Sequence, residues 1–194
     1  MNLIFATNNL HKLNEVNAIL SKKYTVKGLD AIACLEELAE TQNTLEGNAT
    51  QKASYVHSKY KVNCFSDDSG LLIEALENRP GVLSARYAGE QKNAEDNINK
   101  VLQEMGDIEQ RNAVFKTIIS LFINRKETLF EGAIYGTILK ERRGKQGFGY
   151  DAIFQPNGYN ISFAEMSLEQ KNKISHRAIT LNKLITFLNL KYAI

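Results

Sequence analysis

Hydrophobic and polar residues recur along the chain with periods that predict its secondary structure. Residues 2–7 form a short apolar run, which predicts a buried strand. In the next segment the apolar residues are spaced as on one face of a helix, at Leu13, Val16, Ile19 and Leu20. The chain is therefore expected to begin with a strand followed by a helix.

The pattern then predicts a helix, a strand and a third helix. Thr44 can cap a helix whose inward positions are Leu45, Ala49, Ala53 and Val56. Residues 62–66 predict a second strand, which runs into an acidic turn at residues 67–70. A later helix is marked by the apolar positions Ile98, Val101, Leu102 and Met105.

Two long strands and a last helix complete the pattern. Residues 113–124 and 128–140 are rich in Ile, Phe, Thr and Tyr, with a turn expected near residues 125–127. Ser175 can cap a final helix with an apolar face at Ala178, Leu181, Leu184, Ile185 and Leu188. This order predicts a mixed α/β fold with antiparallel character in the middle.

Length and charge narrow the function classes. The 194 residues suit one domain, or two small lobes around a shared cleft. The hydrophobic share of 43% and the charged share of 24% are ordinary for a globular protein. The net charge of +2 is too small to indicate a nucleic-acid-binding protein, so any function of basic residues must come from local clustering.

Cysteine usage and hydropathy bear on location. Cys34 and Cys64 are far apart, which predicts buried small side chains in a reducing compartment, with neither a metal site nor a redox pair. The first residues do not have the pattern of a signal peptide. No stretch approaches the ~18 consecutive apolar residues of a membrane span. We therefore expect a cytoplasmic protein that does not enter a membrane.

The first polar motif is residues 7–12, Thr-Asn-Asn-Leu-His-Lys, between the first strand and the first helix. Backbone N–H groups at a helix start attract anions, and Lys12 adds a full positive charge. The structural alternative is that Asn8 and Asn9 form a turn and that Lys12 is a solvated surface lysine. The glycines of a P-loop are missing.

The second motif is Asp67-Asp68-Ser69-Gly70, directly after a strand. Carboxylates at a strand end can hold Mg²⁺ through oxygen and orient a water molecule. Only one of the two needs to face a substrate, because neighbours in an extended chain point to opposite sides. The structural alternative is an acidic turn in which glycine supplies a positive φ.

The third motif is Gly147-Phe148-Gly149-Tyr150-Asp151. Glycines on both sides of Phe148 are entropically costly and add nothing to packing, but they let a backbone approach a ligand. A base stacking on Phe148 would gain about 1–3 kcal/mol. The structural alternative is a glycine-rich turn whose phenylalanine fills the core.

The fourth motif is residues 171–177, which end in His176 and Arg177. Both fall in the first turn of the last helix, where cations oppose the helix dipole at a cost of about 0.3–1 kcal/mol each. Such a placement favours a specific task, such as donating hydrogen bonds to a ligand rich in acceptors. The structural alternative is that both side chains point into solvent.

The order of these motifs resembles the inosine triphosphate pyrophosphatase family. The resemblance is carried by residues 2–12, Glu40-Thr41 with residues 48–53, residues 67–71, residues 80–81 with 84–89, residues 147–151, and residues 162–166 with 175–177. These segments run from the first residues to the last helix, and motifs of this length in this order are highly specific.

The resemblance implies an elongated α/β fold in which a mixed β-sheet is flanked by helices, with two lobes around a central nucleotide cleft, usually in a homodimer. It also implies a Mg²⁺-dependent enzyme that cleaves purine nucleoside triphosphates between the α and β phosphates. The substrates would be inosine, deoxyinosine and xanthosine triphosphates, so that the enzyme would remove deaminated nucleotides from the nucleotide pool.

Roles around the phosphates follow from the resemblance residue by residue. Asp68 would bind Mg²⁺ and act as the base toward the attacking water, and Glu40 would be the second metal carboxylate. Hydrolysis at phosphorus depends on charge neutralisation and positioning, and Mg²⁺ accepts few protein carboxylates. Positions in contact with the triphosphate would be Asn9, Lys12, Lys52 and Lys171.

Roles around the base follow in the same way. Phe148 would stack on the base and Asp151 would touch its edge. His176 and Arg177 would donate to the 6-oxo group, which adenine lacks, and such contacts can discriminate by about 10⁴–10⁵. The full set expected at the substrate is Thr7, Asn8, Asn9, Leu10, His11, Lys12, Lys52, Ser69, Phe148, Gly149, Tyr150, Asp151, Lys171, His176 and Arg177.

Three positions depart from the family pattern. Gln42 stands where a glycine often follows Glu-Thr, Leu45 where a phenylalanine is frequent, and Gly47 where a glutamate is frequent. These changes leave the named ligands intact, but Glu36 and Glu37 become alternatives to Glu40 as the second metal ligand.

Two other function classes compete with this interpretation. Maf-like nucleotide pyrophosphatases resemble this chain only at the level of the fold, and the motifs at Phe148 and at His176-Arg177 argue against them. A regulator that binds nucleotides without turnover would have no need for the carboxylate of Asp68. A nucleic-acid-binding role is weaker still, because the charge is nearly balanced.

Overall fold

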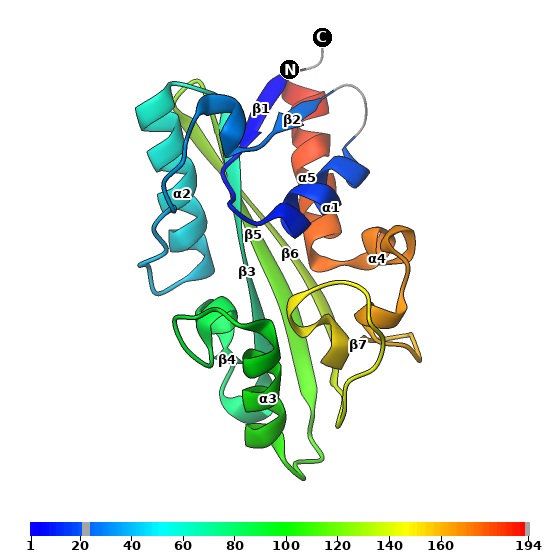
Figure 1. Cartoon of the computed structure of the whole chain (residues 1–194). Helices are drawn as coiled ribbons and strands as arrows, with labels where there is room; N and C mark the ends of the chain where they lie inside the picture. Colours follow the sequence, from blue (N-terminus) through cyan, green and yellow to red (C-terminus); the bar gives the residue numbers. More distant parts are fainter. Residues whose placement is uncertain (21–23, 193–194) are drawn as a thin grey trace. The chain divides into compact units, whose positions relative to one another are not determined.

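The computed structural model describes residues 1–20 and 24–192, and these contain one mixed β-sheet (Figure 1). The strands are β1 Asn2–Phe5, β2 Thr25–Lys27, β3 Cys64–Ile73, β4 Arg79–Pro80, β5 Asn112–Ile123, β6 Lys126–Ile138 and β7 Phe154–Pro156. Their order is β2-β1-β3-β5-β6-β7, with β4 paired to β3 off this path. Both β2 and β3 are parallel to β1, whereas β4 is antiparallel to β3 and β7 to β6.

Five α-helices accompany the sheet within the described residues. They are α1 Leu10–Ile19, α2 Leu45–Tyr60, α3 Ala94–Met105, α4 Leu168–Ile174 and α5 His176–Lys191. Thr44 caps α2 as expected, because its Oγ1 accepts from the backbone N–H of Gly47 over 3.0 Å. The expected mixed sheet flanked by helices is confirmed, and so are the four helices that the apolar spacing predicts.

The chain divides into two compact units, which are described separately. Unit 1 consists of Met1–Asp68, Thr117–Gly132 and Arg177–Ile194, and unit 2 consists of Ser69–Lys116 and Ala133–His176. The strands β3, β5 and β6 each contribute residues to both units.

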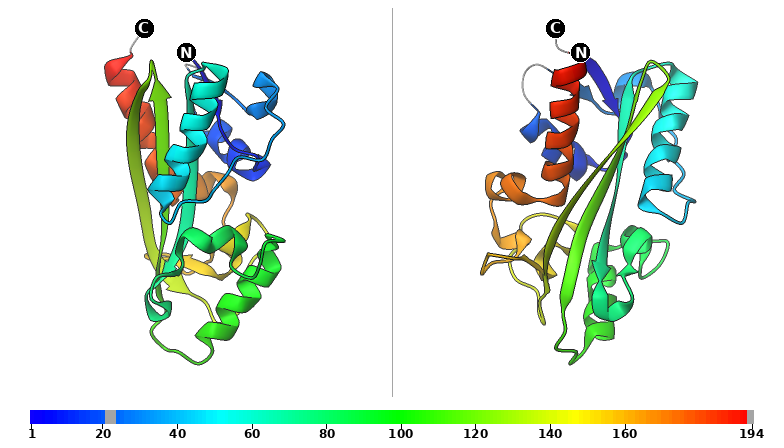
Figure 2. Two further views of the ribbon diagram at one scale, coloured as in Figure 1. Left: turned by 90° about the vertical axis from the view of Figure 1, so that its left-hand side faces the viewer. Right: turned by 180° about the vertical axis from the view of Figure 1, so that it is seen from behind.

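In unit 1 both faces of the sheet are buried. Leu3 and Phe5 of β1 belong to a core that includes apolar residues of α1 and α5, whereas Ile4 belongs to a second core that includes Val56 of α2. Successive residues of a strand point to opposite faces, so β1 presents one residue set to each core. Accordingly, α5 and α2 lie on opposite sides of the strands (Figure 2).

Unit 2 has its own core. It brings Leu71 and Ile73 of β3 against Ile98, Val101 and Met105 of α3. Aromatic residues complete this core, at Tyr87, Phe115, Tyr150, Phe154 and Phe163.

The hairpin between β5 and β6 agrees with its prediction to within a few residues. Its turn lies at Asn124 and Arg125, whose φ values are 50° and 65°. Two adjacent residues with positive φ are what a type I′ hairpin turn requires. The expected centre at residues 125–127 was therefore one or two positions late.

The acidic segment differs from its expected conformation. Asp67 and Asp68 were expected in a turn, but they lie inside the ten-residue strand β3. A strand is a poor environment for aspartate by propensity, so contacts with distant residues must compensate. Those contacts form the candidate site.

Candidate active site

The first polar motif forms the start of α1. Asn9 is the N-cap, and its side chain accepts from the backbone N–H groups of His11 and Lys12 over 2.9 and 3.3 Å. Its own N–H donates to Oγ1 of Thr7 over 3.1 Å. Asn9 therefore caps α1 and does not form a turn with Asn8. Lys12 pairs with Asp67 over 2.8 Å, so the structural alternative of a solvated surface lysine is wrong, while contact between residues 7–12 and a triphosphate stays a prediction. The side chain of Leu10 is 72% exposed.

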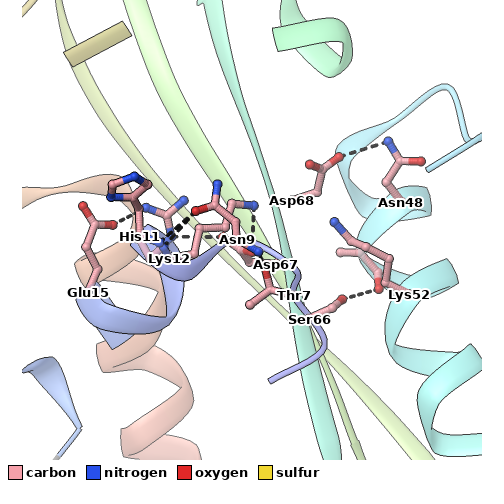
Figure 3. Close-up of polar contacts among 12 residues, drawn as sticks. Thr7, Asn9, His11, Lys12, Glu15, Asn48, Lys52, Ser66, Asp67 and Asp68 are labelled. Carbon is pink, nitrogen blue, oxygen red and sulfur yellow. Dashed lines mark hydrogen bonds and ion pairs between the residues drawn. The ribbon is translucent and has the colours of Figure 1, made fainter. Parts of the chain in front are cut away.

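Asp67 is the centre of a buried charge network. Its Oδ1 lies 2.8 Å from Nζ of Lys12 (Figure 3). Its Oδ2 lies 3.0 Å from Nε of Arg177. Nη1 of Arg177 also pairs with Oε2 of Glu15. Burial acts to raise the pKa of Asp67, but the charges of Lys12 and Arg177 hold that pKa well below its usual range. Asp67 is therefore ionised and fixed between two cations.

Asp67 and its neighbour point to opposite faces of β3, as the sequence predicted for an extended chain. Asp67 contacts residues of α1 and α5, whereas Oδ2 of Asp68 accepts from Nδ2 of Asn48 on α2 over 3.0 Å. Ser66, two residues before Asp68, also faces α2 and donates to the backbone oxygen of Ala49. The alternation therefore gives the two aspartates different partners.

On the side of β3 that faces α2, the cation of Lys52 lies between the carboxyl groups of Asp68 and Glu40. Asp68 is 8% exposed, and Lys52 of α2 is 5% exposed and pairs with Glu40. Burial raises the pKa of Asp68, and the charges of Lys52 and Lys12 offset only part of that rise. Burial also acts to raise the pKa of Glu40, but Lys52 brings it below its ordinary value. A buried carboxyl group with a raised pKa is suited to accept a proton.

Of the three glutamates that could be the second metal ligand, Glu40 pairs with Lys52, and the choice among them stays a prediction. The carboxylate of Glu40 shares the positive charge of Lys52 with Asp68. Glu36 instead accepts from the hydroxyl of Tyr55 over 2.7 Å and pairs with Lys59 near the end of α2. Glu37 is exposed.

A second polar group lies in unit 2. Oδ2 of Asp151 accepts from the backbone N–H of Phe148 over 2.8 Å and from Nζ of Lys171 over 2.7 Å. Both members of this ion pair are buried, and Nζ of Lys171 lies 4.9 Å from the centre of the Phe148 ring. The ring itself is half-buried. Asp151 and Lys171 thus support the residue that is expected to stack on a base.

The two glycines beside Phe148 serve different purposes. Gly147 has φ +76°, and a Cβ there would lie 2.1 Å from Oδ2 of Asp151, so the carboxylate needs that space. Gly149 has φ +60°, and a Cβ there would meet nothing within 4 Å. Glycine is therefore favoured at position 149 by the backbone conformation and not by lack of space, because a positive φ is costly for other residues. Tyr150 is buried and donates to the backbone oxygen of Ser84 over 2.9 Å.

His176 and Arg177 are adjacent in sequence but belong to different units. The ring of His176 stacks on Phe115, with the ring centres 4.7 Å apart and the planes at 13°. Both side chains are buried, so the structural alternative, that they point into solvent, is wrong. The contacts of Arg177 with Asp67 and Glu15 give it a structural task, and its contact with a base stays a prediction.

Two functional neighbours escaped the sequence reasoning. Asn48 lies within a motif that carried the family resemblance, four residues before Lys52, which places both on one face of α2. Glu15 lies three residues after Lys12 on α1, a spacing that also puts two side chains on one face. This spacing could have identified both residues. Ser69 is half-buried in β3, and its role, like that of Lys171 at phosphates, stays a prediction.

The donor chemistry around Asp68 fits a hard divalent cation. Mg²⁺ prefers oxygen ligands and binds through one or two carboxylates, with water and phosphate oxygens completing its shell. Asp68 and Glu40 supply two carboxylates around Lys52. Within residues 1–20 and 24–192, no group of three or more His, Cys, Asp or Glu residues could hold a metal ion. Asp68 and Glu40 would therefore be the protein's share of the ligands, with water or phosphate oxygens supplying the rest.

Two further findings concern the cysteines and the hydropathy of the helices. Cys34 and Cys64 are buried, as expected. Among the described helices, none combines the length and the apolar composition that crossing a membrane requires.

Comparisons with known proteins agree over nearly the whole chain. The model of the Ham1 family matches residues 3–187. The chain is 51% identical to the dITP/XTP pyrophosphatase of Flavobacterium psychrophilum, covering 96% of this chain and 98% of that protein. It is 52% identical to the dITP/XTP pyrophosphatase of Porphyromonas gingivalis, covering 96% of each.

Solved structures show the same likeness. The structure of the Ham1 protein of Staphylococcus aureus superimposes with a TM-score of 0.89 at 36% identity, over 98% of this chain and 100% of that one. A HAM1 protein from Coxiella burnetii gives a TM-score of 0.89 at 34% identity, over 98% and 99%.

Proposed function

This chain belongs to the Ham1 family, and from that premise we propose that it hydrolyses deaminated purine nucleoside triphosphates to the monophosphate and pyrophosphate. Inosine, deoxyinosine and xanthosine triphosphates are the proposed substrates. One observation carries the proposal: the carboxylate of Asp68 is buried on the α2 side of β3, where it accepts from Asn48 over 3.0 Å and lies near the cation of Lys52. The names of the relatives that are about half identical support the same reaction.

The reaction adds one water across the bond between the α and β phosphates. The oxygen of water forms a bond to the α phosphorus, and the bond from that phosphorus to the bridging oxygen breaks. Asp68 accepts a proton from the water, and pyrophosphate leaves with the bridging oxygen. A positioned general base of this kind contributes typically about 10²–10⁴-fold to a rate.

Lys12 and Lys52 would neutralise the phosphate charge. Each ammonium group has three donors, so Lys12 can hold Asp67 and still donate to a phosphate oxygen. Lys52 can do the same while it pairs with Glu40. The two ion pairs orient the lysines before the substrate arrives, which is the preorganisation that stabilises a charged transition state.

We include Mg²⁺ in the proposal, with Asp68 and Glu40 as its protein ligands. When bound, it would neutralise charge on the leaving pyrophosphate. The oxygen donors described above support this choice.

Recognition of the base would fall to Phe148, His176 and Arg177. Phe148 offers an aromatic face whose loop is held by Asp151 and Lys171. His176, fixed by stacking on Phe115, would donate to the 6-oxo group together with Arg177. A donor facing the amino group of adenine would be left unpaired, and adenosine triphosphate would therefore be a poor substrate.

We further propose a cytoplasmic homodimer. The family resemblance supports the dimer, and the two buried thiols support a reducing compartment. Sedimentation equilibrium tests the dimer, since a mass of 21.8 kDa would be that of one chain.

The decisive experiment measures pyrophosphate released from inosine, xanthosine, adenosine and guanosine triphosphates, each with Mg²⁺ and with a chelator. We expect fast release from the first two only, and none with the chelator. Release from all four would support the pyrophosphatase activity and contradict the proposed recognition of the base. No release from any of them would favour a nucleotide-binding protein without turnover.

A further inference from the structure

The irregular segment that carries Glu40 is bound to α2 by side chains of that helix. The backbone N–H of Thr41 donates to Oε1 of Gln51 over 3.0 Å, and Nε2 of Gln51 donates back to Oγ1 of Thr41 over 2.9 Å. The backbone N–H of Gln42 donates to Oδ1 of Asn48 over 2.9 Å. Two side chains of α2 therefore hold the two residues that follow Glu40.

Asn48 differs from Gln51 because it has a second partner. Its Nδ2 donates to Oδ2 of Asp68 over 3.0 Å, and its side chain is 1% exposed. Gln51 bonds twice to the same residue, Thr41. Figure 3 shows the contact between Asn48 and Asp68. Because Asn48 also accepts from Gln42, it alone of these two side chains connects the Glu40 segment to the carboxylate on β3.

The orientation of the Asn48 amide follows from its partners. A backbone N–H can only donate, so the group of Asn48 that faces Gln42 must be the carbonyl oxygen. The amino group then has to face Asp68, which as a carboxylate accepts. The reversed amide would set two donors against each other on one side and two acceptors on the other. The contact with Gln42 therefore ensures that Asp68 receives a donor.

Gly47 permits this arrangement. A Cβ at Gly47 would lie 2.7 Å from Cβ of Gln42 and 3.1 Å from Oγ1 of Thr44. Any larger residue would push the Gln42 segment away from the start of α2. Gln42 and Gly47 are two of the positions that depart from the family pattern. They pack against each other, so the side chain at position 42 requires the absence of one at position 47.

We propose that Asn48 is a positioning residue for hydrolysis: it ties the carboxylate of Asp68 to the segment that carries Glu40. The two acids come from a strand and from a segment without regular structure, and this amide gives them a common anchor. The inference rests on the proposed function, in which both acids hold Mg²⁺ and Asp68 accepts the proton. Side chains that orient a metal ligand in this way typically contribute about 10–100-fold to affinity or activity.

The first test compares Asn48→Ala with Gln51→Ala in the full chain. Both changes remove one amide that holds the Glu40 segment, but only Asn48→Ala removes the donor to Asp68. We expect Asn48→Ala to lower kcat for inosine triphosphate by about 10–100-fold with KM within about threefold. We expect Gln51→Ala to change kcat by less than about threefold. Equal losses in both variants, or an unchanged kcat in Asn48→Ala, would overturn the proposal.

A second measurement does not depend on turnover. Mn²⁺ alone is titrated into each protein, and the free ion is followed by its paramagnetic resonance signal. Asn48→Ala should bind Mn²⁺ about 10-fold more weakly than the wild type, and Gln51→Ala should bind it as the wild type does. Equal affinity in all three proteins would contradict the positioning role.

Hydrogen exchange distinguishes failure of the proposed link through Asn48, called the bridge here, from failure of the proposed pyrophosphatase function. The Gln42 amide should exchange faster in Asn48→Ala than in the wild type, because its acceptor is gone. Asn48→Asp keeps the size of the side chain and the acceptor for Gln42, but it removes the donor to Asp68. It should therefore keep the Gln42 amide protected and still lower kcat, and it replaces Asn48→Ala in the test if that variant is poorly folded. A wild type without pyrophosphatase activity would refute the proposed function, whereas unchanged Gln42 exchange would refute the bridge itself.

Discussion

Arg177 and Asp67 are 110 residues apart in the sequence and form a buried ion pair, with Nε of the arginine 3.0 Å from Oδ2 of the aspartate. The pair joins the start of α5 to the middle of β3, on the face of the strand opposite to Asp68. Asp67 accepts from Lys12 through its other oxygen, over 2.8 Å. One carboxylate therefore orders both a lysine expected at the phosphates and an arginine expected at the base.

Replacement of Arg177 by methionine should destabilise the protein strongly. Glu15 and one oxygen of Asp67 would lose their cation in a buried site, and breaking such a pair costs about 3–5 kcal/mol. Urea unfolding of Arg177→Met and of the wild type measures this difference. The matched control is Lys173→Met, which removes an exposed pair with Glu169 and should leave stability unchanged. Equal midpoints for Arg177→Met and the control would show that the buried pair contributes nothing.

Glu15→Gln separates the structural role of Arg177 from its expected role at the base. This change weakens the ion pair but keeps the guanidinium and Asp67, so stability should fall while selectivity for inosine over adenosine triphosphate is retained. Arg177→Met should lower both. The measurement is the ratio of kcat/KM for the two nucleotides. If Arg177→Met keeps that ratio, Arg177 takes no part in base recognition.

The stabilising effect of Asp67 should disappear in acid. The folded protein holds the pKa of Asp67 below its unfolded value of about 3.9. A group with a depressed pKa contributes its full stability above the unfolded pKa and loses it as the pH falls through the folded one. The difference in unfolding free energy between wild type and Asp67→Asn should therefore be constant at neutral pH and shrink below about pH 4. A difference that stays constant down to pH 3 would contradict the depressed pKa.

Local sequence patterns were sufficient for elements whose defining contacts are local. Thr44 caps its own helix, and the turn at Asn124 and Arg125 is defined by adjacent residues. The strands β2, β4 and β7 have three, two and three residues and exist through pairing with strands elsewhere in the chain. No periodic pattern develops over so few residues, so the sequence could not identify them.

The candidate site shows the same difference between local patterns, which the sequence reveals, and long-range contacts, which it does not. The order of motifs identified Asp68, Lys52 and Phe148, but partners at long range were not visible. The unfavourable position of Arg177 at a helix start suggested a ligand, which stays a prediction, but gave no sign of the two carboxylates from other elements that pair with it. The acidic segment had the composition of a turn and was expected as one, yet its contacts with Lys12 and Arg177 stabilise it as a strand. Tertiary charge pairing overrode local propensity in both cases.

Asp68→Asn should abolish most turnover without unfolding the protein. An amide oxygen can still accept from Asn48, so packing on α2 is retained, but the amide cannot take a proton from water. We expect kcat to fall by about 10²–10⁴-fold, with nucleotide binding by calorimetry and the melting temperature close to wild type. The neighbouring change Asp67→Asn should instead lower the melting temperature. Near-normal kcat in Asp68→Asn would remove Asp68 from the mechanism.

Phe148→Ala should raise KM more than it lowers stability. The ring is half-buried and its loop is held independently by Asp151, so its removal costs mainly the stacking of the base, about 1–3 kcal/mol or a 5- to 150-fold rise in KM. Phe163 is the matched control, because its ring lies 5.6 Å from the same Lys171 ammonium but is fully buried. Phe163→Ala should therefore lower the unfolding free energy by about 3–5 kcal/mol. Kinetics and urea unfolding of the two variants distinguish a ligand-facing ring from a core ring, and an unchanged KM with a destabilised fold in Phe148→Ala would assign Phe148 to the core.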